Sequence, residues 1–288
     1  MRVFRTRAIG FYSLIKRSIR AYARHDMAVH ASALAYRLLF SMFPFIIFLL
    51  ALLSFFQFPA FFGWLRQQVA PFLPQPAFEQ VDAIIVELQV PQKGLLSLGA
   101  VTALWLASSA MRSLMRALNV AYSARESRPA WKRYPLSVLY TLGIALMLIA
   151  AATLMNFGPR AMQWLAGEIG LESLFVTLWA WLRWPAALFL SSLAVAIAYH
   201  LVPNVQHRFR LISAGSLLSV LVWSVASLAF SYYVQNFANY DVMFGSIGAI
   251  IVMLAYIHLS ISVLLFGAEV NAVIERQAAA DANVQGAS

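Results

Sequence analysis

Long apolar runs, each about as long as a helix that crosses a bilayer, constrain this chain more than any other feature. A hydrocarbon core about 30 Å thick is crossed by about 20 residues of α-helix. Six runs reach that length, at residues 38–58, 94–118, 135–157, 184–202, 211–235 and 244–266. Because backbone polar groups in lipid must be satisfied within the segment, such runs favour helices. The sequence predicts an all-α integral membrane protein with six transmembrane helices.

The first of these runs carries a charge and a helix break. Arg37 lies at its start, and Pro44 lies inside it. A proline removes one intrahelical hydrogen bond and leaves the carbonyl of Phe40 without its usual donor. Membrane helices tolerate this where a hydroxyl or a neighbouring helix supplies a partner, and Ser41 is our candidate. We expect this helix to face other protein.

The distribution of Lys and Arg predicts the orientation. Apart from Arg37 at the start of the first run and Arg112 and Arg116 inside the second, fourteen Lys and Arg residues lie on the side of the two termini and four on the other side. Cytoplasmic segments carry the excess of positive charge. The sequence therefore predicts that both termini lie in the cytoplasm.

Outside the six runs we divide the chain into a basic cytoplasmic segment (1–30), a membrane bundle (31–272) and a flexible cytoplasmic tail (273–288). Residues 9–24 suit an amphipathic helix, which either lies on the anionic inner leaflet or caps the bundle. We expect short interfacial helices in the outer loops, at 78–88 and within the Trp-rich stretch 171–184. We expect the helix of the third run to start at Pro135 on the cytoplasmic side and to stop at Gly158-Pro159 on the outer side.

Polar residues gather on one face of the second run at 100° per residue. This face includes Thr102, Ser109, Arg112 and Arg116. Ionisable side chains at that depth face a protein interior or a wet cavity, or else extend to lipid phosphates. Both alternatives remain open for the two arginines.

The fifth run has a serine face that includes Ser227 and Ser231, and the sixth carries His258 near its middle. Small polar residues allow helices to approach closely and form hydrogen bonds between them. The serine face therefore indicates either helix packing or the lining of a polar cavity.

Arg37, Arg112, Arg116 and Glu269 are predicted at similar depth on the cytoplasmic side. Together they would form a net-positive cluster. Such a cluster is either a structural ion-pair network or a site for an anionic head group, because arginine matches phosphate geometry. For Glu269 we favour the structural role.

Catalytic signatures are lacking. The chain has no Cys, and its five His residues have no close metal-ligand spacing. There is no G-x-S-x-G motif and no phosphate-binding Gly loop. We expect no catalytic residue, no metal and no cofactor, and hence no enzyme.

Several motifs resemble the YihY/BrkB family: HASALAYRLLFSMFP from His30, ALNVAY from Ala117 with RPAW from Arg128, YHLVPN from Tyr199, FGSIGAII from Phe244 and GAEVNA from Gly267. The resemblance covers about residues 29–272. It implies a six-span bacterial inner-membrane protein, linked to virulence, serum resistance and lipid handling. Some members are labelled ribonuclease BN, an activity that we do not expect here.

The hypothesis is a protein that binds or moves an anionic lipid or amphiphile through a polar intramembrane cavity open to the cytoplasm. The alternatives are a structural envelope protein and, less favoured, an ion or proton-coupled transporter. We expect membrane lipids as partners and no nucleic acid, and the sequence leaves open whether the chain forms a homo-oligomer. The candidate residues for the cavity or head group are Arg37, Ser41, Thr102, Ser109, Arg112, Arg116, Ser227, Ser231, His258 and Glu269, with Pro44 as the helix break.

Overall fold

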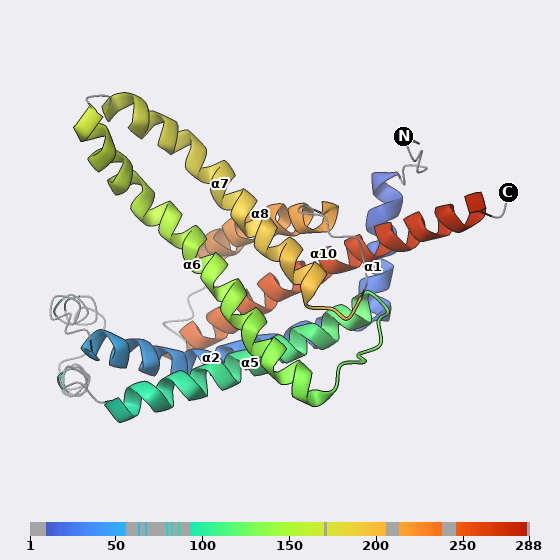
Figure 1. The fold of residues 1–288 in the computed structure, drawn as a ribbon, viewed down its shortest axis with the longest axis horizontal. Coiled ribbons are helices and arrows are strands. Elements are labelled where there is room, and N and C mark those ends of the chain that lie inside the picture. The colour runs from blue at the N-terminus through green and yellow to red at the C-terminus, as the bar shows by residue number, and fades with distance from the viewer. Residues whose placement is uncertain are drawn as a thin grey trace. The chain divides into compact units, whose positions relative to one another are not determined.

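The computed structural model describes residues 10–55, 93–169, 172–205, 213–237 and 246–286, together with positions 63, 67, 79, 82 and 86. All regular structure in this part of the chain is α-helical (Figure 1), which confirms the predicted all-α class. The helices are α1 (Phe11–Arg24), α2 (Met27–Phe55), α5 (Lys93–Ala121), α6 (Ala130–Ile169), α7 (Glu172–Leu201), α8 (Ala214–Phe237) and α10 (Ser246–Gly286).

Each of the six apolar runs overlaps one long helix, from α2 to α10. Four of these helices contain a stretch long and apolar enough to cross a membrane: Met27–Phe48, Trp184–Leu201, Ala214–Asn236 and Ile250–Asp281. The chain is therefore a helical membrane protein. Crossing by α5 and α6 as well stays a prediction.

Several predicted boundaries are wrong. Helix α6 begins at Ala130 rather than Pro135, and it continues through Gly158-Pro159 to Ile169. A proline removes only one backbone donor, so a long helix can continue across it. The stretch 172–184 is the first part of α7 rather than a separate interfacial helix. Helix α10 extends to Gly286, so most of the predicted flexible tail is helical.

The chain packs as two units, a different division from the predicted one, which followed membrane boundaries. The first unit comprises Met1–Tyr36 and Ala110–Ser288, and the second comprises Arg37–Ser109. In the first unit, α6 and α7 lie side by side as an antiparallel pair (Figure 1), α8 lies along α10, and α7 packs against α8. Helix α1 packs against α10. This last contact places the N-terminal basic helix directly on the last helix of the bundle.

The second unit pairs the later part of α2 with the earlier part of α5. A Cβ atom at Gly99 would lie 3.1 Å from the backbone of Phe48, so the glycine allows these helices to approach closely. Pro44 lies within the continuous helix α2. The Ser41 hydroxyl donates to the carbonyl of Leu38 at 2.7 Å, so the expectation that it satisfies the carbonyl of Phe40 is wrong. The predicted interfacial helix at 78–88 lies mostly outside the described residues.

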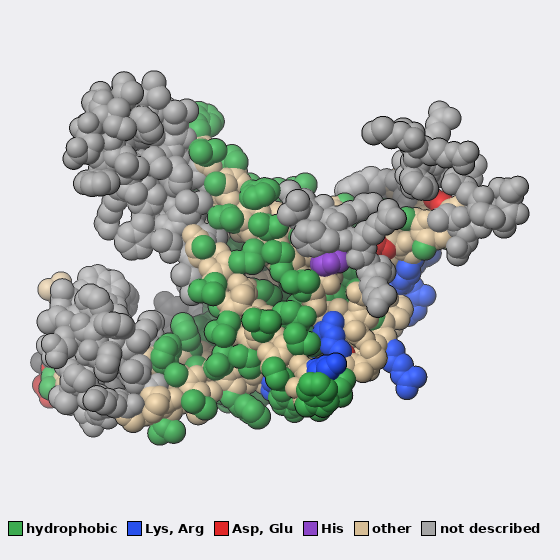
Figure 2. Space-filling model, viewed as in Figure 1, with side chains coloured by type: hydrophobic (Ala, Val, Ile, Leu, Met, Phe, Trp, Pro, Cys, Tyr) green, Lys and Arg blue, Asp and Glu red, His purple; other side chains and the backbone are tan. Residues whose placement is uncertain are grey.

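Hydrophobic side chains cover most of the visible face of the helices, whereas Lys and Arg side chains gather near the termini and the α5–α6 connection (Figure 2). Exposed large apolar residues such as Leu146, Val225 and Leu228 are common on α6 and α8. A soluble protein rarely exposes so much contiguous apolar surface. Lipid is the solvent that matches these helix faces.

Candidate functional site: a polar junction of helix ends

The predicted cytoplasmic segments of the first unit meet in one polar region, which we call the junction. It comprises α1, residues 117–129 at the end of α5 and in the α5–α6 connection, residues 196–204 at the end of α7, residues 213–219 at the start of α8, and residues 264–278 of α10. Hydrogen bonds between side chains and backbone join these segments, as described below.

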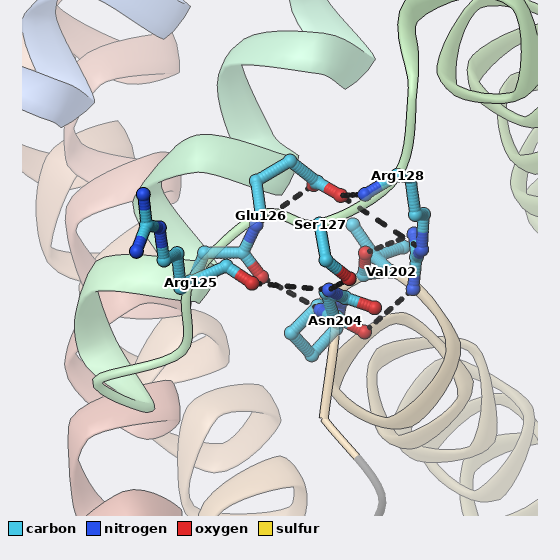
Figure 3. A network of polar contacts seen from close by, with 8 residues as sticks. Arg125, Glu126, Ser127, Arg128, Val202 and Asn204 are labelled. Atoms are coloured by element: carbon cyan, nitrogen blue, oxygen red, sulfur yellow. Dashed lines mark hydrogen bonds and ion pairs between the residues drawn. The ribbon is translucent and has the colours of Figure 1, made fainter.

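Arg128 joins the α5–α6 connection to the end of α7 (Figure 3). Its guanidinium donates to the carbonyls of Val202 at 3.2 Å and Pro203 at 3.0 Å. Its backbone N–H donates to the carboxylate of Glu126 at 3.1 Å. Carbonyls at a helix end have no intrahelical donor, so the planar guanidinium satisfies groups that the helix itself cannot.

Asn204 makes the second link between the same two segments (Figure 3). Its backbone N–H donates to Oδ1 of Asn119 at 2.7 Å, while its side-chain amide donates to the carbonyl of Arg125 and the hydroxyl of Ser127. Asn119 in turn donates to the carboxylate of Glu126 at 2.9 Å. Because Asn119 is buried, this network fixes the connection against the bundle.

Asn271 joins α10 to the start of α8. Its Oδ1 accepts the backbone N–H of Gly215 at 2.8 Å, and its amide donates to the hydroxyl of Ser213 at 2.7 Å. The backbone N–H of Gly215 lies in the first turn of α8, where it has no intrahelical acceptor. A side chain of a distant helix therefore caps α8.

Gly267 brings α8, α7 and α10 into close contact. A Cβ atom there would overlap the hydroxyl of Ser219 and lie 2.8 Å from the hydroxyl oxygen of Tyr199. These two hydroxyls are hydrogen bonded to each other at 2.8 Å, and Tyr199 also donates to the carbonyl of Leu264. Only glycine leaves room for this buried hydrogen-bonded group.

Glu269 of α10 has a side chain that is 0% exposed, and its partner is the residue that directly follows α1. Nδ1 of His25 lies 2.6 Å from its Oε1. A second link lies further along the same two helices, where Arg17 donates to Gln277 at 3.0 Å. These contacts hold α1 on α10. They agree with one of the two alternatives predicted for the N-terminal helix, that it caps the bundle.

A cavity of about 220 Å³ lies within the junction. Its polar lining includes Tyr122, His200, Ser213, Asn271 and Glu275, and its apolar lining includes Ala196 and Ile274. Burial raises the pKa of the Tyr122 phenol far above its ordinary value, and the carboxylate of Glu275 acts in the same direction. The phenol therefore stays neutral at physiological pH. The cavity offers hydrogen-bonding groups of both kinds beside apolar surface.

A second cavity, of about 210 Å³, lies between α1 and α10 and is lined by Ile19, Tyr22, Ser262, Val263 and Phe266. Its lining is mostly apolar. Among the described residues, no group of three or more His, Cys, Asp or Glu side chains is arranged to hold a metal ion.

Arg37 and Ser109 are the two predicted site residues that the structure joins directly. The Arg37 guanidinium donates to the Ser109 hydroxyl at 2.6 Å, within the second unit. Thr102, also in that unit, donates to carbonyls of its own helix.

Apart from Ser41, the other predicted residues lie in the first unit and contact other partners. Arg112 lies over the ring of Tyr134, with its guanidinium carbon 4.5 Å from the ring centre, and it donates to Ser137 at 3.1 Å. Arg116 is exposed and donates to Ser113. Contacts of this kind with an interfacial aromatic ring suit an arginine near a membrane surface.

The polar residues predicted for α8 and α10 also contact separate partners. Ser227 lies 3.1 Å from the hydroxyl of Tyr256, and Ser231 accepts from Gln235 on its own helix. His258 lies between the hydroxyls of Ser32 and Ser262, each at 3.5 Å. None of the ten predicted residues lines either of the two cavities described above.

Six residues with central contacts in the junction were not among the candidates predicted from the sequence: His25, Asn119, Arg128, Asn204, Gly267 and Asn271. Five of them lie within the motifs ALNVAY, RPAW, YHLVPN and GAEVNA that carried the family resemblance. These motifs were therefore the sequence feature that could have identified the junction residues. In the structure they lie where helix ends contact one another.

Comparison with known proteins gives a consistent family. The sequence model of the family described as "Virulence factor BrkB" matches residues 18–288. The putative ribonuclease-like protein YfkH of Bacillus subtilis is 30% identical over 266 residues, which cover 92% of this chain and 96% of that protein. A UPF0761 membrane protein of Chromohalobacter salexigens is 29% identical over 90% of this chain and 62% of its own length. Another, of Pseudoalteromonas atlantica, is 26% identical over 88% of this chain and 82% of its own length. No solved structure matches.

Proposed function

This chain belongs to the virulence factor BrkB family of membrane proteins, and from that premise we propose its topology and its ligand. We propose a six-span protein of the bacterial inner membrane with both termini in the cytoplasm. We further propose that it binds an anionic lipid or another anionic amphiphile at its cytoplasmic side, and that it acts without catalysing a reaction.

The topology is supported by which segments meet. The N-terminal helix, the α5–α6 connection and the later part of α10 were assigned to the cytoplasm from charge alone, and the end of α7 and the start of α8 to the cytoplasmic ends of their runs. The junction contains every one of these segments. A protein with an odd number of crossings between any two of these segments would place those two on opposite faces.

Cysteine labelling tests the topology directly, because the chain has no Cys of its own. Ser127 in the α5–α6 connection and Gln67 in the first outer connection are both exposed. We expect a membrane-impermeant maleimide to label Gln67→Cys in intact spheroplasts and to label Ser127→Cys only after permeabilisation. Labelling of both variants in intact spheroplasts would contradict the proposed topology.

The ligand proposal depends on one observation: exposed basic side chains of α1 lie next to a residue that lines the apolar cavity between α1 and α10. Lys16 and Arg20 of α1 are both exposed, and Ile19 between them lines the apolar cavity. Each basic side chain near an anionic membrane surface contributes on the order of 1 kcal/mol of attraction. An anionic amphiphile is the ligand class that needs cationic and apolar surfaces side by side.

Thermal unfolding of purified protein in a neutral detergent tests this proposal. A ligand that binds only the folded state raises the unfolding temperature. We expect phosphatidylglycerol to raise it at lower concentration than phosphatidylcholine with the same acyl chains. Equal effects of the two lipids would reject an anionic ligand.

A structural role in the envelope is the second candidate, and the network around Asn119, Arg128 and Asn204 favours it. There the polar side chains satisfy backbone groups of neighbouring segments, as in a rigid connection. On that hypothesis the basic surface serves topology only, and neither lipid would be preferred.

A further inference from the structure

The cavity between α1 and α10 is almost wholly apolar, yet it lies beside a basic helix. Ile19 and Tyr22 line it from α1, and Val263 and Phe266 line it from α10. The rings of Tyr22 and Phe266 meet edge to face, with their centres 6.3 Å apart. The two helices therefore touch at these rings while leaving an apolar groove of about 210 Å³ beside them.

The depth of the groove follows from its residues on α10. Phe266 ends the apolar run 244–266, and the charged and amide residues of the junction begin three residues later, at Glu269. The groove thus lies where the hydrocarbon region is expected to give way to the head groups on the cytoplasmic side. At this level the acyl chain of a lipid joins its head group, so a chain in the groove would place its head group beside α1.

One face of α1 borders the groove and points away from α10. Tyr12 is 78% exposed and Ile19 is 56% exposed, and Lys16 and Arg20 on the same face are also exposed. The spacing i, i+4, i+7 and i+8 places these four side chains in a single stripe. Cationic groups therefore lie within one turn of the groove-lining Ile19.

The remaining basic residues of α1 have a different role. Arg17 bonds to Gln277, and the positive charge of Arg24 acts on the carboxylate of Glu269. In contrast, Lys16 lies over the ring of Tyr12 at 5.9 Å, and within the described part of the chain neither it nor Arg20 has a carboxylate partner. Two of the four cations are thus directed at α10, and two are left for an external anion.

We propose that this groove binds one acyl chain of an anionic phospholipid of the inner leaflet, with the lipid phosphate held by Lys16 and Arg20. The inference rests on the proposed function and names the site for it. Charge complementarity selects the head group, the apolar lining selects the chain, and the Tyr12 ring covers the boundary between them.

The test uses the full chain in neutral detergent, with native mass spectrometry to measure binding of phosphatidylglycerol and phosphatidylcholine. Lys16→Gln/Arg20→Gln removes both cations from the stripe and preserves much of their length. The matched control is Arg125→Gln/Lys132→Gln, which removes two exposed cations outside the stripe, one in the α5–α6 connection and one in the first turn of α6. We expect phosphatidylglycerol to bind the first variant about twenty-five-fold more weakly than wild type, about fivefold for each cation removed, and the control unchanged.

A second variant tests the groove itself. Ile19→Trp places a larger side chain at an exposed lining position, where the fold tolerates it, and should weaken binding of both lipids. Unchanged melting without lipid confirms that each variant is folded.

The outcomes separate this inference from the proposed function. Wild-type preference for phosphatidylglycerol that survives Lys16→Gln/Arg20→Gln overturns this site but leaves the anionic ligand in place. No preference in the wild type overturns both. A wild-type dimer that Ile19→Trp dissociates would show that a second copy of the chain occupies the groove, which also overturns the inference.

Discussion

Gly267→Ala is the substitution for which the structure predicts the clearest loss of stability. The added methyl group would overlap the Ser219 hydroxyl and lie 2.7 Å from the carbonyl oxygen of Gly215 and 2.8 Å from the hydroxyl oxygen of Tyr199. Contacts this short require atoms to move. The two hydroxyls are fixed by their mutual hydrogen bond and by the Leu264 carbonyl, so movement breaks buried hydrogen bonds.

Two opposing effects set the size of the loss. Alanine favours a helix over glycine by about 1 kcal/mol, whereas overpacking a well-packed interior costs about 1–3 kcal/mol and each broken buried hydrogen bond adds about 1 kcal/mol. We expect a net loss of about 1–3 kcal/mol. For a chain of this size, the unfolding temperature should fall by roughly 2–10 °C.

The assay is thermal unfolding of the full chain in detergent, followed by the fraction that remains monodisperse after heating. Gly143→Ala on α6 is the matched control, because a Cβ atom there meets nothing within 4 Å. This control should melt at or slightly above the wild-type temperature. If Gly267→Ala melts as high as wild type, or if Gly143→Ala falls equally far, the close approach of α8 and α10 does not limit stability.

Three further predictions concern the junction and the proposal that the protein acts without catalysis. Arg128→Ala removes the donors to the carbonyls of Val202 and Pro203 and should lower the free energy of unfolding by about 1.5–3 kcal/mol, measured in the same melting assay; Arg128→Lys should rescue it only in part. His25→Ala removes the partner of the buried Glu269 carboxylate and should lower the free energy of unfolding by about 3–5 kcal/mol, more than Glu269→Gln does. A double-variant cycle in which the two losses simply add would refute the pairing. Purified protein should not hydrolyse RNA; hydrolysis that stays proportional to protein through every purification step would contradict this.

The fold class was predictable because it follows from length and hydropathy alone. Long apolar runs admit little besides helices, and six of them overlap six long helices. The boundaries were not predictable from Pro and Gly, as α6 shows by continuing through Gly158-Pro159. A helix stop is only a local preference. The packing of α6 along α7 outweighs it here.

The predicted cluster of charges shows a different limit. Arg112, Arg116 and Glu269 were grouped because they share a depth, and depth is all that hydropathy and charge can supply. Which way each side chain points depends on the rotation of its helix, which packing sets. Arg112 therefore lies over Tyr134, while Glu269 meets His25, a residue 244 positions away in the chain.

Packing and ligand binding can be separated by asking which polar groups the fold already uses. Arg128, Asn119, Asn204 and Asn271 satisfy backbone or side-chain groups of neighbouring segments, so replacing them should change stability first. The stripe on α1 has the opposite character, since its cations lack carboxylate partners among the described residues and its apolar members are exposed. A residue that contributes little to folding but borders an apolar groove at the head-group level is the kind on which lipid binding can depend. Variants of the stripe should therefore lose lipid at constant unfolding temperature, whereas variants of the network should lose unfolding temperature at constant lipid preference.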